Sequence, residues 1–519
     1  MNISRLILYG ILLIVGIGSV SADEPDDILN KFIDAVGGLD KIAAVTSQSG
    51  YYTVDYMGLS GKAEILYSFP DKYYMKMEIG PMTQIMGCDG MTGWRVDDAG
   101  LVSIMSQAEM RPIVNALYYA SYSYIIPNRI AGRIEYRGTE DMAGTLFHQL
   151  ACYPEGGDSV FFKINDKTGL MDYQISYEGD VEMLNHSLEY RQIDGLTISW
   201  KETMMGRGTP ITATQSIDSI FFNRHIPDSL FNMPGQRGID YNFADEADSI
   251  VLPIHVHNDH VFLDIKIDGL GPFSFLLDSG AGKTVVAKSV ADRLGIKASG
   301  PIAMRGIGGF GEVSIGEIDS LTLGKLSLHL DRTMIADLSM FHSFDAGELG
   351  GVLGYDFFVR FPMTLNFEGK TLTLYNPGKS YRPTFANMLE SELYFQIPLI
   401  MVELNGRRSR MLFDLGAQTG ILLFGQQIID ETLREDLMQD STTLEIMGVG
   451  GVSSVFMSTL DSISIGTEKI QNPKIIWSDN AEELPFRGYI EGIIGTSILK
   501  RYKVYMDYQG GKIGLDPAD

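Results

Sequence analysis

The sequence contains little cysteine and few basic residues for its length. Only 2 of its 519 residues are Cys, which excludes a disulfide scaffold and a zinc site built from several cysteines. Lys and Arg total 41 against 66 Asp and Glu, so the formal net charge is −25. This acidic balance argues against nucleic acid or an anionic membrane surface as the main partner.

Long apolar runs are also missing, apart from Leu6 to Val20 near the N-terminus. That run is shorter than the roughly 20 residues that a membrane span needs. Arg5 precedes it, and small residues lead from it to the acidic Asp23. The pattern is typical of a signal peptide over residues 1–22, with a membrane anchor as the alternative. We therefore expect an exported protein, periplasmic or secreted, from a bacterial envelope.

The two cysteines would then lie in an oxidising compartment. Cys88 and Cys152 could form a disulfide there, or they could remain two buried thiols.

The rest of the composition indicates a globular protein rich in strands. Its 57 Gly and 19 Pro favour many turns and few long helices. Residues 23–40 have helical apolar spacing, and 50–231 mostly alternate as short strands, interrupted by a less regular aromatic segment at 115–126. A polar, acidic stretch at 235–250 is typical of a linker between domains.

An internal repeat fills the region beyond this linker. Asp278-Ser279-Gly280-Ala281 follows an apolar strand, and Asp414-Leu415-Gly416-Ala417 does the same at an offset of 136. A glycine pair recurs at an offset of 142, and an apolar-apolar-Gly strand recurs at 141. Several features in one order at a nearly fixed offset predict two lobes related by a pseudo-two-fold axis.

Each copy places an Asp after an apolar strand and close to a Gly. Apolar backing holds such a carboxyl rigidly and partly desolvates it, and Gly280 and Gly416 permit a tight turn. A two-fold relation would bring Asp278 and Asp414 face to face, where they share one proton. One can then act as the base on a water and the other as the acid, with no cofactor, metal or covalent intermediate.

These motifs resemble the retropepsin-like aspartyl protease family over residues 251–519. The resemblance implies that Asp278 and Asp414 are catalytic and that the hydroxyl of Ser279 supports the site. It also implies that the Gly-rich segments form flaps over a peptide or protein substrate, and that the chain is a monomer because both lobes are fused. The expected flap residues are Gly306, Gly308, Gly309, Gly448, Gly450 and Gly451.

The second copy departs from the family pattern at Leu415. The family has Ser or Thr there, and the two hydroxyls hydrogen-bond across the axis. Leu cannot form these bonds, so an active protease and a weakened, redirected or dead site both remain open.

Two other motifs lead elsewhere. Residues 306–311 fit the dinucleotide pattern G-x-G-x-x-G, but strands rather than a helix are expected after them. His255, His257 and His260 suggest a metal site, but Asn258-Asp259 is a turn signal and favours a hairpin tip.

The N-terminal half carries no catalytic set. Residues 70–73, 89–94, 189–196 and 227–231 are similar to the outer-membrane lipoprotein-sorting (LolA/LolB-type) family. That resemblance implies a curved antiparallel sheet with a covering helix, able to hold a lipid or acyl chain. A packed sheet with an aromatic core is the alternative.

Together these features predict a mainly β protein. The expected parts are a signal peptide (1–22), a lipoprotein-sorting-like β domain (23–234), a linker (235–250) and two protease lobes (251–385 and 386–519). The expected function is an exported aspartic endopeptidase. The alternative is a non-catalytic envelope protein that binds lipids or peptides and has a degenerate protease site.

Overall fold

The computed structural model describes residues 25–518, except for a set of short segments. Those segments are 81, 97–99, 127, 179–180, 210, 236–239, 244–246, 307–308, 331, 342–347, 395, 425–434, 436, 439–440, 449–450 and 479–489. The predicted signal peptide, and Gly308 and Gly450 of the predicted flaps, lie outside the described residues. Within them, no helix is long and apolar enough to cross a membrane.

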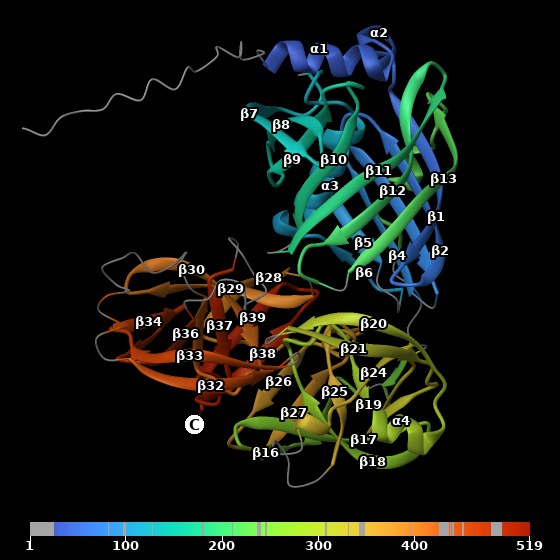
Figure 1. Cartoon of the computed structure of the whole chain (residues 1–519). Coiled ribbons are helices and arrows are strands. Elements are labelled where there is room, and N and C mark those ends of the chain that lie inside the picture. The colour runs from blue at the N-terminus through green and yellow to red at the C-terminus, as the bar shows by residue number, and fades with distance from the viewer. Residues whose placement is uncertain are drawn as a thin grey trace, which may run out of the picture.

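The N-terminal domain is one 13-stranded antiparallel sheet with three helices (Figure 1). The helices are α1 (Pro25–Val36), α2 (Leu39–Ala43) and α3 (Gln107–Ala120). The strands are β1 (Ser47–Tyr56), β2 (Leu59–Ser68), β3 (Lys72–Ile79), β4 (Met82–Asp89), β5 (Gly93–Val96), β6 (Val102–Ile104), β7 (Gly132–Met142), β8 (Thr145–Pro154), β9 (Val160–Asn165), β10 (Met171–Glu178), β11 (Val181–Ile193), β12 (Leu196–Gly206) and β13 (Thr212–Phe222).

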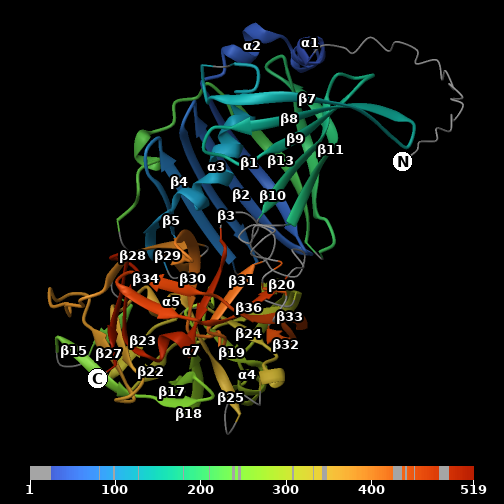
Figure 2. The same cartoon turned by 90° about the vertical axis from the view of Figure 1, so that its left-hand side faces the viewer.

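Pairing of β1 with β13 joins two runs of hairpins into this one sheet. Helix α1 buries Ile28, Phe32 and Val36, the helical spacing that the sequence predicts, in a cluster with Leu150 and Phe162 of the sheet. Helix α3 contacts β3 and β8. It covers part of the segment expected to be irregular, and its start was not foreseen. Figure 2 shows the sheet curving around α3.

Cys88 and Cys152 do not form a disulfide; both are free and buried. They pack in different clusters, Cys88 with Tyr67 and Tyr73, and Cys152 with Leu150 and Phe162. Burial raises the pKa of the Cys152 thiol to about 12. The alternative of two buried thiols is therefore the one the structure contains.

The C-terminal region contains the two copies of the repeat, which keep the names lobe 1 and lobe 2 with the predicted bounds 251–385 and 386–519. The strands leading into lobe 1 and within it are β14 (Tyr241–Phe243), β15 (Ser249–Pro253), β16 (His255–His257), β17 (His260–Ile267), β18 (Leu270–Leu277), β19 (Val285–Ala287), β20 (Ala298–Gly306), β21 (Gly309–Gly316), β22 (Leu321–Leu323), β23 (Leu326–Leu328), β24 (Thr333–Ala336), β25 (Leu349–Leu353), β26 (Met363–Asn366) and β27 (Thr371–Tyr375), with helices α4 (Lys288–Leu294) and α5 (Tyr355–Phe358).

Lobe 2 repeats this order of elements. Its strands are β28 (Met388–Tyr394), β29 (Ile397–Leu404), β30 (Arg407–Asp414), β31 (Ile421–Phe424), β32 (Thr442–Gly448), β33 (Gly451–Thr459), β34 (Ser462–Ile465), β35 (Glu468–Gln471), β36 (Lys474–Ser478), β37 (Gly492–Gly495), β38 (Tyr502–Asp507) and β39 (Lys512–Pro517), with helix α7 (Thr496–Leu499). In both lobes the Asp-bearing strand pairs in parallel with the apolar-apolar-Gly strand: β18 with β25, and β30 with β37.

One sheet joins the lobes. Strands β26 and β27 of lobe 1 continue through β38, β39 and β28 of lobe 2, because β26 pairs with β38. Strand β14, within the predicted linker, pairs with β23. A buried ion pair between Arg360 and Asp240 ties that linker to lobe 1 at 2.5 Å. The protein is thus mainly β, as predicted.

Candidate active site

Asp278 and Asp414 lie at equivalent ends of equivalent strands. The backbone N–H of Asp278 donates to the carbonyl of Leu353 at 3.0 Å, and Asp414 is the register partner of Gly495. Each Asp therefore follows a buried strand and is held by the strand beside it. The structure brings the two carboxyls together, as the two-fold argument predicts.

Glycine lets the two loops approach this closely. A Cβ added at Gly280 would lie 2.5 Å from Cγ and Oδ2 of Asp414, and one at Gly416 would overlap the carboxyl of Asp278. Each carboxyl also accepts a hydrogen bond from its own loop. The N–H of Gly280 donates to Oδ1 of Asp278 at 2.8 Å, and the N–H of Gly416 donates to Oδ1 of Asp414 at 2.8 Å.

A hydrogen bond joins the two carboxyls, which requires a proton on one of them. Burial raises the pKa of Asp278 well above its ordinary value, and the charge of Asp414 and the hydrogen bond between them raise it further. Burial also raises the pKa of Asp414, but the hydrogen bond from Asp278 opposes this shift. Both shifts favour a pair that holds one proton between its two carboxyls.

The side chain of Ser279 bonds its own loop to the loop of Asp414. Its buried hydroxyl donates to the carbonyl of Phe413 at 2.9 Å and accepts from the N–H of Leu415 at 2.8 Å. Leu415 is fully buried in the core that both lobes share. Because Leu415 has no hydroxyl, its side chain cannot form the equivalent two hydrogen bonds to the loop of Asp278. The two hydrogen bonds of Ser279 to the loop of Asp414 remain.

Two further residues make contacts between the lobes: Tyr508, which the sequence did not single out, and His260, which it singled out only within a possible metal site. The hydroxyl of Tyr508, from lobe 2, donates to the carbonyl of Ser279 at 3.4 Å. His260, from lobe 1, is buried, and its Nε2 donates to the carbonyl of Gly416 at 3.1 Å. Burial lowers the pKa of His260, which favours the neutral imidazole. Sequence alone gave no signal for Tyr508, because it lies 94 residues beyond Asp414 in chain order.

The loops are supported differently in the two lobes. In lobe 1, Oδ1 of buried Asp356 accepts from the hydroxyl and the N–H of Thr284, and that hydroxyl accepts from Gly354 at 3.2 Å. In lobe 2, the position equivalent to Thr284 is Gly420, and the hydroxyl of Thr496 donates to the carbonyl of Ala417 at 2.9 Å. Two sequence copies therefore reach one backbone geometry through different side chains.

Each predicted flap is a hairpin. Gly306 pairs with Gly309 at the end of β20 and β21, and Gly448 pairs with Gly451 at the end of β32 and β33. Strands follow the G-x-G-x-x-G segment, so the helix that a dinucleotide site needs is not there.

The histidine segment is a hairpin, as expected. His255 and His257 lie on β16, and Asn258 and Asp259 have positive φ in the turn. Within the described part of the chain, no group of three or more His, Cys, Asp or Glu side chains could hold a metal.

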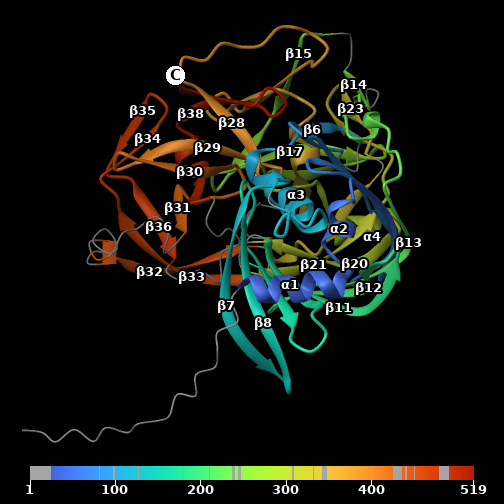
Figure 3. The ribbon, with the colours of Figure 1, turned by 90° about the horizontal axis from the view of Figure 1, so that it is seen from above.

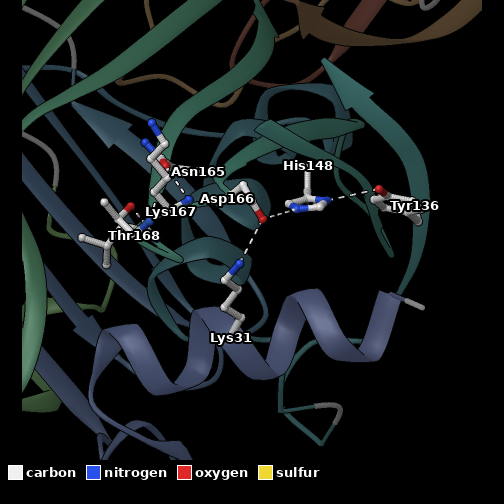
Figure 4. Close-up of polar contacts among 8 residues, drawn as sticks. Lys31, Tyr136, His148, Asn165, Asp166, Lys167 and Thr168 are labelled. Carbon is white, nitrogen blue, oxygen red and sulfur yellow. Dashed lines mark hydrogen bonds and ion pairs between the residues drawn. The ribbon is translucent and has the colours of Figure 1, made fainter. Parts of the chain in front are cut away.

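A second polar cluster lies in the N-terminal domain (Figure 4). The ring of buried His148 contacts Tyr136 Oη at 3.1 Å and Asp166 Oδ1 at 3.0 Å, and Lys31 of α1 donates to the same oxygen at 2.9 Å. Hydrogen bonds from His148 and Lys31 lower the pKa of Asp166. Because Lys31 is the contact to α1, this cluster fastens the helix to the sheet.

The repeat and the paired carboxyls agree with the comparison with known families. Both lobes match the aspartyl protease family. The matched residues are 263–357 and 400–498, which include Asp278 and Asp414. No curated protein matches the chain.

Solved structures similar to this chain share about a tenth of its sequence. A DUF1329 family protein from Desulfovibrio piger is 10% identical with a TM-score of 0.30, covering 40% of this chain and 96% of that one. An outer membrane lipoprotein-sorting protein domain from Vibrio parahaemolyticus is 10% identical (TM-score 0.28; 40% and 95%). A LolA superfamily protein from Nitrosomonas europaea is 10% identical (TM-score 0.29; 39% and 96%).

Proposed function

We propose that this protein is an exported aspartic endopeptidase. The observation that carries the proposal is the pair of partly buried carboxyls, Asp278 and Asp414, joined by a hydrogen bond between two lobes that match the aspartyl protease family. The apolar run at the N-terminus supports export.

In the proposed mechanism, Asp278 starts protonated and Asp414 starts as the carboxylate. The carboxylate of Asp414 takes a proton from a water, whose oxygen attacks the carbonyl carbon of the peptide bond. Protonated Asp278 gives its proton to the carbonyl oxygen, and a tetrahedral diol forms. Asp414 then protonates the amide nitrogen, the C–N bond breaks, and Asp278 recovers a proton from the diol. The products are an acid and an amine, and the pair returns to its starting state.

A mixed peptide library tests this proposal. The chain lacking residues 1–22 would be incubated with the library from pH 3 to 8, and the new termini identified by mass spectrometry. Cleavage is expected with a preference for apolar side chains around the cut bond. No cleavage at any pH would contradict the proposal and favour the alternative of a non-catalytic binding protein.

The dependence of kcat/KM on pH should be bell-shaped. Only the singly protonated pair is active, and the pKa values of both carboxyls are raised. The rate therefore rises as pH increases through the lower apparent pKa, which lies above that of an ordinary Asp. It falls as pH increases through the upper one. A plot of kcat/KM against pH measures both limits; a flat plot would contradict shared protonation.

His260 should act as a positioning residue. His260→Phe removes the donor to Gly416, so the loop of Asp414 shifts, and kcat is expected to fall about tenfold with little change in KM. His260→Gln keeps an N–H donor and should recover most of the rate. The control is His255→Phe, on the neighbouring strand with an exposed side chain, which should change nothing. Equal effects at both positions would contradict this role.

A ligand for the N-terminal domain remains a separate proposal. Burial raises the pKa of Glu202 on β12. Burial also raises the pKa values of Tyr67 and Tyr119, and the charge of Glu202 adds to both shifts. A carboxyl among aromatic rings favours an amphipathic ligand, such as a lipid with an acyl chain, over a purely apolar one. Mass spectrometry of the purified full chain would identify a copurified lipid, and none is expected if the domain is only packed.

A further inference from the structure

One face of lobe 2 carries both the carboxyl of Asp414 and a set of apolar side chains. Side chains alternate along a strand, so Leu412 lies on the same face as Asp414, about 7 Å away. Leu412 is the register partner of Ile493, which is in turn the partner of Leu422. We call this surface, with Phe424, the aspartate face of lobe 2. A substrate lying over the two carboxyls must place its neighbouring side chains on it.

Ala108 of the N-terminal domain lies on the aspartate face. It is buried in one cluster with all four residues of that face, and Ala417 of the catalytic loop packs against the same cluster. Leu412 and Ile493 are each only 2% exposed, whereas their counterparts in lobe 1, Leu276 and Val352, are 7% and 9% exposed. Figure 3 shows α3 over the region where the two lobes meet.

The segment that presents Ala108 is held rigidly. Ser106 begins α3 with a capping box, in which its hydroxyl accepts from the N–H of Glu109 and the Glu109 carboxylate accepts from the N–H of Ser106. Glu109 also forms a buried ion pair with Arg95 of β5 at 2.5 Å. The guanidinium of Arg95 lies 6.0 Å from the centre of the ring of Tyr355. Tyr355 is the first residue of α5, shortly after β25 of lobe 1. Ala108 at the start of α3 thus contacts lobe 2, while Arg95, the ion-pair partner of Glu109, contacts lobe 1.

A second contact reaches the first flap. Leu59 and Met82, near two turns of the N-terminal sheet, pack against Val313 and Ile315 of β21. The N-terminal domain therefore contacts both the flap of lobe 1 and the aspartate face of lobe 2. A domain in this position limits both the movement of the flap and the space beside the carboxyls.

We infer that the start of α3 occupies the place on lobe 2 where a substrate side chain next to the cut bond would lie. The N-terminal domain therefore controls access to the aspartate pair. Substrate binds only the fraction of molecules in which α3 has moved away, and kcat/KM is reduced by that fraction. The effect on catalysis rests on the proposed peptidase function; the occupation itself does not.

Ala108→Glu tests this inference against a matched control. The change places a carboxylate in an apolar contact, which opposes docking, while an acidic residue in the first turn favours the helix itself. Gln107→Glu adds the same charge one residue earlier, at an exposed position. Both variants and the parent would be compared for peptide cleavage and for hydrogen exchange of α3, β30 and β37, with circular dichroism to verify folding.

Ala108→Glu is expected to raise kcat/KM by roughly tenfold or more and to speed exchange at the start of α3 and in β37, with no change in Gln107→Glu. If Ala108→Glu does not fold, Leu59→Ser at the flap contact should give a smaller gain of the same kind. Faster exchange without cleavage by any variant supports occupation and counts against the peptidase. Unchanged exchange and rate in folded Ala108→Glu, or a reduced rate, would overturn the inference.

Discussion

Replacement of Asp278 by Asn is expected to reduce peptide hydrolysis by roughly 1,000-fold or more, and Asp414→Asn should do the same. Asn has the shape of Asp but cannot donate or accept the transferred proton. In Asp278→Asn the carbonyl oxygen of the substrate loses its acid, and in Asp414→Asn the water loses its base. Single-turnover cleavage of the best library peptide measures both losses.

The same substitution should stabilise the fold at neutral pH. The folded pKa of Asp278 is raised, so the folded chain binds more protons than the unfolded chain above the ordinary Asp range. Stability is therefore fully present below the unfolded pKa and falls as pH rises through the folded pKa. Asn carries no proton to lose, so denaturant unfolding of Asp278→Asn should show a weaker fall with pH than the parent.

Asp461→Asn provides the control for both measurements, since Asp461 is exposed in lobe 2. It should leave cleavage and the pH dependence of unfolding unchanged. Full cleavage by Asp278→Asn would contradict the two-Asp mechanism. A stability profile identical to that of the parent would contradict the shared proton.

Ser279→Ala is expected to destabilise the protein by about 2–5 kcal/mol. The change removes one hydroxyl but leaves two buried groups, the carbonyl of Phe413 and the N–H of Leu415, without their partner. Because Leu415 supplies no hydroxyl in return, nothing in the opposite loop compensates. Urea unfolding measures the loss, and peptide cleavage should also weaken as the loops separate.

Ser409→Ala separates this effect from the mere loss of a buried serine. Ser409 is 1% exposed on β30, and its hydroxyl has no hydrogen-bond partner among the described residues. Its replacement should be neutral or slightly stabilising, because an unpaired buried hydroxyl is costly. Equal destabilisation by both variants would show that the bonds of Ser279 contribute nothing particular.

Much of the aspartate site was predictable because the sequence contains its motif twice, and a repeat relates residues that are far apart in the chain. Each of the two Asp-x-Gly-Ala motifs follows an apolar strand and is followed later by an apolar-apolar-Gly strand. The same local structure is therefore predicted for both copies. A symmetric pairing then places Asp278 beside Asp414 without knowledge of any other contact. Strand alternation predicted much of β1 to β3 and β9 in the same way, since burial on one face imposes a period of two.

The contacts that break the symmetry were not predictable. His260, Tyr508, Thr284 and Thr496 lie at unmatched positions, and their partners are backbone groups or side chains that only folding brings near. The cysteines illustrate the same limit, because composition allowed a disulfide that their separate clusters exclude.

The sequence by itself determined the local chemistry: strand periods, glycine turns, and two carboxyls on equivalent loops. Tertiary structure alone decided that Ser279 bonds both Phe413 and Leu415, and that Ala108 is buried in one cluster with Leu412 and Ile493 of lobe 2. The physical reason is that periodicity and turn chemistry act over a few residues. Docking between the N-terminal domain and lobe 2 depends on the shapes of surfaces formed by segments some 300 residues apart in the chain.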